Sequence, residues 1–277
     1  MLQIGKSQTL TFDEEIPYGA YLICEDGERI MLPLSQLPED ANVGDALTVF
    51  VYQDHDGQLT ATTRMPVMQV GECGYVKVVG TNPGGAFVDW GLDKDLFVPK
   101  KQQDKPMEVG KSYVVVPYLD ERDGRLTGSS KLHQHLREQN IYFQAGEKVN
   151  LLICGRSDLG YKAVVNNHSL GLLYQDDVFQ RLRIGESVSG YIKQIRPDGK
   201  IDLTLRAPAG QDRDELSEKI LQHLAEQGGV SAITDKADPN LIYRVFGVSK
   251  GDYKKALGAL YKQQKISLSK TEIRLLD

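Results

Sequence analysis

The sequence has few cysteines, and none are close enough together to form a recognisable metal or disulfide motif. Cys24, Cys73 and Cys154 are the only three among 277 residues, and no Cys-x-x-Cys pair occurs. This argues against a disulfide framework and against a zinc knuckle, so we interpret all three as buried apolar residues. The chain also has no run of about 18 apolar residues, and its start lacks the basic and apolar regions of a signal peptide. We therefore expect a cytoplasmic protein.

Positive charge is scarce as well. The chain holds 33 Lys and Arg against 38 Asp and Glu, which gives a formal net charge of -5. Phosphate contacts need clustered cations, so this balance argues against a generic polyanion binder. Any nucleic-acid site must be local.

Recognisable catalytic motifs are absent too. The sequence has no Gly-rich phosphate loop with Lys-Ser/Thr and no nucleophile elbow. His133 and His135 lie two residues apart, on different faces of any helix, with no Glu to complete a metalloprotease motif. Asp54-His55-Asp56-Gly57 begins like a calcium loop, but Leu59 occupies the glycine position and Met65 that of the bidentate Glu, so we interpret it as a hairpin turn. We expect no enzyme activity, no metal and no cofactor.

The sequence does contain an internal repeat. Two short motifs recur three times each, with offsets of 66 and then 75 residues. The extra residues of the third copy lie upstream of Gly160 and fit the polar, helix-like stretch at 132–140. The recurring motifs are Val43-Gly44-Asp45 with Val109-Gly110-Lys111 and Ile184-Gly185-Glu186, and Asp56-Gly57-Gln58-Leu59 with Asp123-Gly124-Arg125-Leu126 and Asp198-Gly199-Lys200-Ile201.

Each copy has the pattern of β-structure. In the first copy, residues 47–52 and 59–62 read as two strands around the Asp56-Gly57 turn, because Asp-Gly tolerates the positive φ of a tight hairpin. In the second copy, residues 84–90 and 96–99 supply two more short strands. Five short strands in about 65 residues predict a small closed barrel.

After Pro208 the apolar spacing changes from period two to period 3.6. Leu216, Ile220 and Leu224 share one helical face, and Gly228-Gly229 ends that helix. The change of period indicates a separate domain.

Two further helices and a hairpin follow in this domain. Asp238-Pro239 is a strong helix start, and Gly247 ends the helix. Ser249–Asp252 has the spacing of a capping box and begins the next helix almost at once. Residues 266–268 and 271–275 alternate in polarity like two strands around a tight turn. This order predicts a winged helix.

The second copy carries the clearest motif. Its residues resemble the S1 RNA-binding repeat, which implies an OB-fold barrel. The first copy has Tyr21, Met31 and Pro33 where the second has Phe87, Phe97 and Pro99. The third copy has Lys162 and Leu172 at the two aromatic positions, with Tyr161 and Tyr174 beside them. The motif residues are Gly85-Ala86-Phe87-Val88, Phe97-Val98-Pro99, Val109-Gly110 and Asp123-Gly124-Arg125-Leu126.

Three S1-like repeats followed by a winged helix resemble the conserved virulence factor B family of bacterial proteins over nearly the whole chain. The resemblance implies RNA binding and post-transcriptional regulation, including that of virulence genes, without enzyme activity. We expect a mainly β protein with a C-terminal α+β domain. Its parts are a degenerate S1-like barrel at 1–65, an S1 barrel at 66–131, a helical linker at 132–144, an S1-like barrel at 145–207 and a winged helix at 208–277.

The second barrel supplies the candidate RNA site. Strand alternation puts Phe87 on one face and Trp90 on the other, so Phe87 can stack a base while Trp90 is buried. Phe97 is the second candidate ring, and Tyr21 has the matching place in the first barrel, among acidic residues. The candidate phosphate contacts are Lys77, Lys100 and Lys101 here, and Lys250, Lys254, Lys255, Lys262, Lys265, Lys270 and Arg274 on the winged helix.

Three functions remain open at this stage. The first is single-stranded RNA binding by the second barrel, with electrostatic or duplex contacts from the winged helix. The second is a protein-interaction scaffold, in which Phe87 and Phe97 are barrel core and the lysines are a solvated face. The third is transcription regulation through duplex DNA bound by the winged helix. We expect no membrane partner.

Overall fold

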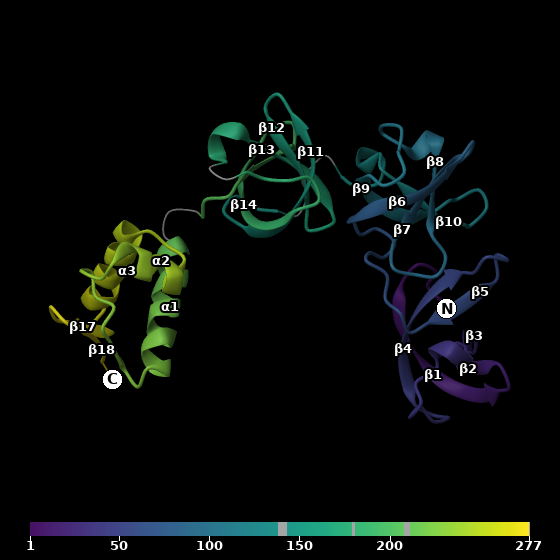
Figure 1. Cartoon of the computed structure of the whole chain (residues 1–277), viewed down its shortest axis with the longest axis horizontal. Coiled ribbons are helices and arrows are strands. Elements are labelled where there is room, and N and C mark those ends of the chain that lie inside the picture. Colours follow the sequence, from purple (N-terminus) through teal and green to yellow (C-terminus); the bar gives the residue numbers. More distant parts are fainter. Residues whose placement is uncertain (138–142, 179–180, 208–210, 277) are drawn as a thin grey trace. The chain divides into compact units, whose positions relative to one another are not determined.

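The computed structural model describes residues 1–137, 143–178, 181–207 and 211–276. It divides into two compact units, Met1–Leu205 and Arg206–Asp277. The first unit contains three five-stranded β-structures, and the second contains helices with a small sheet (Figure 1). The predicted fold class is confirmed. No helix in the described ranges is long and apolar enough to cross a membrane.

The first barrel is closed, in the strand order β1-β2-β3-β5-β4. All its ladders are antiparallel except the pairing of β3 with β5, where Met31 lies opposite Thr60. A short 3-10 helix, Leu34–Gln36, follows β3. The strands are β1 (Ser7–Ile16), β2 (Gly19–Ile23), β3 (Arg29–Pro33), β4 (Ala46–Gln53) and β5 (Leu59–Thr62).

The second barrel is nearly closed, in the order β10-β9-β6-β7-β8. Its two edge strands approach closely at Gly128, where an added Cβ would meet Val98 at 2.9 Å and Leu96 at 3.0 Å. The strands are β6 (Gly74–Asn82), β7 (Gly85–Asp89), β8 (Leu96–Pro99), β9 (Ser112–Leu119) and β10 (Leu126–Ser129), with a 3-10 helix at Lys100–Gln102.

The third barrel is closed again, in the order β11-β12-β13-β15-β14. It repeats the parallel contact, here between β13 and β15. The strands are β11 (Lys148–Ser157), β12 (Gly160–Val165), β13 (Ser169–Tyr174), β14 (Ser187–Ile195) and β15 (Ile201–Thr204), with a 3-10 helix at Gln175–Asp177.

The strand registers confirm the alignment of the three copies. Gly19 pairs with Pro33, Gly85 with Pro99 and Gly160 with Tyr174. A bulge recurs in the first strand of each barrel at the same relative place, between Phe12 and Glu14, Val78 and Gly80, and Ile153 and Gly155. The copies are therefore equivalent residue by residue, and Lys162 does occupy the place of Phe87.

The first two barrels share a core. Phe50 from β4 is fully buried in the second barrel's cluster, where its ring meets Trp90 edge to face at 5.6 Å between centroids. Polar contacts reinforce this junction, since the side chain of Gln69 accepts from Ser7 N–H at 2.9 Å and donates to its hydroxyl at 2.8 Å. The two barrels thus stabilise each other through buried apolar area.

The second and third barrels meet at an apolar junction. Leu132 and Leu136 pack there with Val114, Val116 and Val164. The stretch expected to be helical contains only a three-residue 3-10 helix, Leu132–Gln134, in its described part, because Arg137 already bridges to Ser169 of β13. Residues 138–142 lie outside the described ranges.

The cysteines play two different roles. Cys73 and Cys154 pack against the apolar junction as half-buried thiols, and burial raises their pKa to about 12 and about 11. All three cysteines are partly buried beside apolar clusters, so the predicted apolar surroundings are confirmed and full burial is not. Cys24 differs, because its thiol donates to the Asp26 carboxylate at 2.7 Å.

The second unit has the predicted helix and wing order. Asp238 caps α2 by accepting from Asn240 N–H, and Gly247 ends it with a φ of 72°. Ser249 caps α3 in the same way through Asp252 N–H. A strand that the sequence did not reveal, β16, joins the wing. The elements are α1 (Gln211–Glu226), β16 (Val230–Ser231), α2 (Pro239–Phe246), α3 (Lys250–Lys262), β17 (Ile266–Leu268) and β18 (Ile273–Leu275).

The shared core predicts that a substitution in the first barrel will destabilise the second. Phe50→Ala should cost about 3 to 5 kcal/mol, because it removes a large ring from a close-packed site. Trp90 is the only tryptophan, so its fluorescence during urea unfolding reports the second barrel. Tyr18→Ala, at a side chain that is 63% exposed, serves as the control and should leave the transition in place. An unchanged Trp90 transition in Phe50→Ala would contradict the shared core.

Candidate nucleic-acid interface

Two aromatic rings form a pair on the outer face of the second barrel. Phe87 on β7 lies directly opposite Phe97 on β8, and their ring centroids are 5.1 Å apart. Both rings are half-buried, while Trp90 is buried and donates its indole N–H to Lys94 O at 2.7 Å. The predicted division of faces along β7 is confirmed.

A glycine makes room for this pair. An added Cβ at Gly85 would lie 2.9 Å from the Phe97 ring and 2.3 Å from Val98 O. No side chain fits there, so Phe97 lies over bare backbone beside Phe87. The resulting surface is a ring platform of the kind on which single-stranded bases stack.

The predicted lysines flank the ring pair at its two ends. Lys77 on β6 lies opposite Asp89, two residues beyond Phe87 along β7. Lys100 and Lys101 follow β8 at the other end, where Lys100 N–H donates to Gly84 O at 2.9 Å. All three are exposed, so they can reach phosphates on either side of a stacked base.

A cavity of about 740 Å³ adjoins the rings. Its lining combines Phe87 and Phe97 with carboxylates, cations and part of the first barrel's β4–β5 hairpin. The residues are Gln53, His55, Asp56, Gly57, Phe87, Lys94, Asp95, Phe97, Asp123, Arg125, Leu126 and Thr127. The sequence did not reveal that this hairpin of the first barrel lines a cavity beside the second barrel, because the repeat pattern describes each barrel separately.

The first barrel has a different surface at the matching place. Tyr21 lies opposite Met31, and the Arg29 guanidinium covers the tyrosine ring at 4.7 Å from its centroid. Arg29 is held there by Asp13 at 2.5 Å and Glu14 at 2.6 Å. Residues 1–65 contain 11 Asp and Glu against 3 Lys and Arg. This face repels phosphate and presents no open ring.

The third barrel presents a cationic groove in place of the ring pair. Lys162 and Leu172 face each other across β12 and β13, and a cavity of about 410 Å³ beside them includes Arg196 and Lys200. The sequence contained the signal for two of these cations, because the 75-residue offset maps Phe87 onto Lys162 and Arg125 onto Lys200. Arg196 has no cationic counterpart in the second barrel, because the residue 75 positions earlier is Glu121.

A buried carboxylate fixes the orientation of Arg196. Asp202 is 3% exposed at its side chain and accepts from Arg196 at 2.7 Å and from Gln194 at 2.7 Å. Burial raises the pKa of Asp202, but these hydrogen bonds outweigh it and leave the pKa below its usual value. Arg196 also donates to the hydroxyl of Tyr174, the residue at the place of Pro99.

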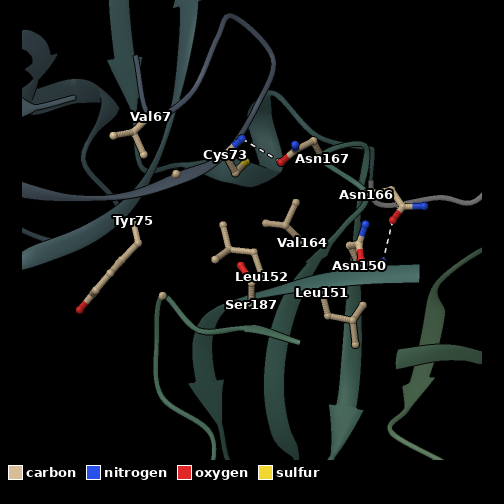
Figure 2. A pocket seen from close by; sticks show the side chains of 12 residues that line it. Val67, Cys73, Tyr75, Asn150, Leu151, Leu152, Val164, Asn166, Asn167 and Ser187 are labelled. Carbon is tan, nitrogen blue, oxygen red and sulfur yellow. Dashed lines mark hydrogen bonds between the residues drawn. The ribbon is translucent and has the colours of Figure 1, made fainter. Parts of the chain in front are cut away.

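A third cavity, of about 620 Å³, lies between the second and third barrels (Figure 2). Two of its side-chain oxygens are already engaged: Asn167 Oδ1 accepts from Cys73 N–H at 3.0 Å, and Asn166 Oδ1 accepts from Asn150 N–H at 2.8 Å. Asn166 and Asn167 both have positive φ, as the tip of a tight hairpin requires. Asn167 therefore links the two barrels, while Asn166 supports the hairpin of the third.

The predicted winged-helix cations divide by their contacts. Lys250 donates to Ala237 O at 2.9 Å, Lys255 pairs with Asp252 at 3.1 Å, and Arg274 pairs with Glu272 at 2.8 Å. The others are exposed and make no ion pair with any residue of the described ranges. They are Lys254, Lys262, Lys265 and Lys270, on α3 and the wing that follows it.

Comparison with known proteins identifies the class first. The S1 domain profile matches residues 4–64, and the CvfB-like winged helix domain profile matches residues 218–275. The S1 match falls on the first barrel, although the motif residues are clearest in the second. The chain thus combines domains of nucleic-acid-binding proteins.

The relatives then point to one family. The chain is 28% identical over 276 residues to the uncharacterized protein YitL of Bacillus subtilis, covering 95% of this chain and 90% of that protein. It is 28% identical over 267 residues to conserved virulence factor B of Staphylococcus aureus strain USA300, covering 90% and 86%. The resemblance to the conserved virulence factor B family is thereby confirmed. A crystal structure of a multidomain protein with nucleic acid binding domains from Streptococcus pneumoniae covers 99% of the chain and 98% of its own, with 22% identity and a TM-score of 0.40.

The buried ion pair of the third barrel generates a prediction about stability and pH. Asp202→Asn should destabilise that barrel by about 2 kcal/mol at neutral pH, because it leaves Arg196 without its carboxylate. Since the folded pKa is lowered, the stabilisation is present above the ordinary carboxyl pKa and is lost as the pH falls through the folded one.

Hydrogen exchange of β15, corrected for intrinsic rates, measures this effect. The difference in β15 protection between wild type and Asp202→Asn should decrease as the pH is lowered. Asp198→Asn, at an exposed carboxylate near by, should change β15 protection much less. Equal protection of wild type and Asp202→Asn at pH 7 would show that the pair does not stabilise the barrel.

Proposed function

We propose that the chain is a non-catalytic protein that binds single-stranded RNA and regulates bacterial gene expression after transcription. The observation that carries the proposal is the half-exposed pair of Phe87 and Phe97, with cations at both ends and a cavity beside it. Such a platform binds bases by stacking and does not require a duplex. The relatives named conserved virulence factor B support a regulatory role.

The proposal includes a division of labour among the domains. S1-like barrels at 1–65, 66–131 and 145–207, a linker at 132–144 and a winged helix at 208–277 are the proposed parts. The second barrel stacks bases, the groove of the third contacts phosphates through Lys162, Arg196 and Lys200, and the winged helix adds electrostatic or duplex contacts. Tyr21 contributes less, because Arg29 covers its ring.

The alternative of a protein-interaction scaffold draws support from the first barrel. Its acidic surface and covered tyrosine do not suit RNA, so this barrel could serve a protein partner. A scaffold does not need the Phe87 ring for nucleic-acid binding. The two functions therefore differ in one measurable property.

Phe87→Ala should weaken single-stranded RNA binding by about 1 to 3 kcal/mol, the usual worth of one stacked base. Fluorescence anisotropy with labelled single-stranded RNA, the matching DNA and duplexes measures the affinities. Tyr18→Ala removes an exposed aromatic from the first barrel and serves as the control. If wild type binds none of these nucleic acids at micromolar protein, the RNA proposal is wrong and the scaffold is favoured.

Salt dependence tests the flanking cations. Replacing Lys77, Lys100 and Lys101 together by Ala should reduce the slope of log K against log salt by about 2, because each phosphate contact to a single strand contributes about 0.7. Replacing Lys254, Lys262 and Lys270 together should act mainly on duplex binding. Lys219→Ala, on the exposed side of α1, is the control. A duplex DNA preference that depends on the α3 and wing lysines would instead favour the transcription regulator.

A further inference from the structure

The β4–β5 hairpin of the first barrel forms one wall of the cavity beside the second barrel's ring pair. His55, Asp56 and Gly57 from its tip line the same cavity as Phe87 and Phe97. Lys94 Nζ donates to two carbonyl oxygens of the hairpin, Gln53 O at 2.9 Å and Asp54 O at 2.5 Å. Just after β5, Arg64 pairs with Asp93 of the second barrel at 2.5 Å. The wall is therefore anchored to the barrel that it faces.

The hairpin tip satisfies its own backbone and leaves two side chains available. Asp54 Oδ1 accepts from Asp56 N–H at 3.0 Å and Gln58 N–H at 2.9 Å, and Gly57 takes the positive φ of 81° that the turn requires. His55 and Asp56 are exposed, and their side chains make no hydrogen bond or ion pair within the described ranges. Both can bind a ligand without breaking the turn.

The charges of the cavity suit a base rather than a phosphate. Asp56, Asp95 and Asp123 line it, and carboxylates repel the backbone of a nucleic acid but accept hydrogen bonds from exocyclic amino groups. Arg125, one of the two cations of the lining, pairs with Asp123 at 3.7 Å. Lys94 is already bound to the hairpin carbonyls. Burial, and then Asp89, raise the pKa of Asp95, while the charge of His55 lowers it, which agrees with His55 lying on the Asp95 side of the cavity.

We propose that His55 and Asp56 of the first barrel read the edge of a base stacked on Phe87 and Phe97, and that they favour adenine or cytosine over uracil. An ionised carboxylate only accepts, and a neutral imidazole can donate through one nitrogen. Adenine and cytosine present an amino donor beside a ring-nitrogen acceptor, which matches that pair. Uracil has no exocyclic amino group, and its single ring N–H lies between two carbonyl oxygens, which the carboxylates of the cavity repel.

The inference rests on the proposed RNA binding, so its test separates the two. Fluorescence anisotropy compares labelled oligo(A), oligo(C) and oligo(U) on the full chain. Wild type should favour oligo(A) or oligo(C) over oligo(U) by about fivefold or more, the scale on which one well-placed side chain discriminates between bases. Asp56→Asn should bring this ratio close to one, because an amide can also donate to the uracil carbonyl. His55→Ala should reduce it too.

Two controls complete the design. Phe87→Ala should weaken all three oligonucleotides by a similar factor, and Glu39→Gln, at an exposed carboxylate of the first barrel outside the cavity, should change neither affinity nor preference. The Trp90 unfolding transition verifies that each variant is folded. If wild type binds RNA through Phe87 but shows no preference against uracil, or keeps its preference in Asp56→Asn, the base-reading role is wrong while RNA binding stands. If wild type binds no RNA, the proposed function itself fails.

Discussion

The contact between Phe50 and Trp90 is the interaction on which the candidate site depends. It buries a ring of the first barrel in the core of the second. Trp90 donates to Lys94 O, and Lys94 in turn holds the β4–β5 hairpin through Gln53 O and Asp54 O. The apolar contact thus fixes the turn that carries Lys94, and that turn fixes the hairpin that walls the cavity. The packing of the first two barrels and the position of the hairpin thus depend on the same buried pair.

The three barrels show how one fold can carry different surfaces. Their registers and bulges coincide, yet the position of Phe87 is a tyrosine covered by Arg29 in the first copy and Lys162 in the third. Barrel formation needs only the buried face of each strand, so the exposed face is free to vary. An S1-type fold in each copy therefore does not imply the same binding in each copy.

Most of the fold could be predicted because its signals are local and repeated. The Asp-Gly turns, the Gly19, Gly85 and Gly160 positions and the capping residues Asp238 and Ser249 act within a few residues of sequence. The two-residue strand β16 was missed, because it is too short to show a period and exists by pairing with β18. The expected helix after Leu132 was also too long, since contacts of Leu132 and Leu136 with other barrels govern that stretch in its described part.

Only part of the candidate site could be predicted from the sequence, because the rest of it is formed by contacts between barrels. Phe87 and Phe97 could be found from strand alternation and the repeat motif, because both belong to one barrel. His55 and Asp56 lie in a turn that looks purely structural, and contacts between the first two barrels, such as Phe50 with Trp90 and Lys94 with Asp54 O, bring that turn to the cavity. Their exposed side chains make no hydrogen bond or ion pair within the described ranges, and they line the cavity together with carboxylates and the two rings. The proposed binding of a polyanion by a chain of net negative charge thus relies on local features, which are the exposed lysines at the two ends of the ring pair and stacking on the rings themselves.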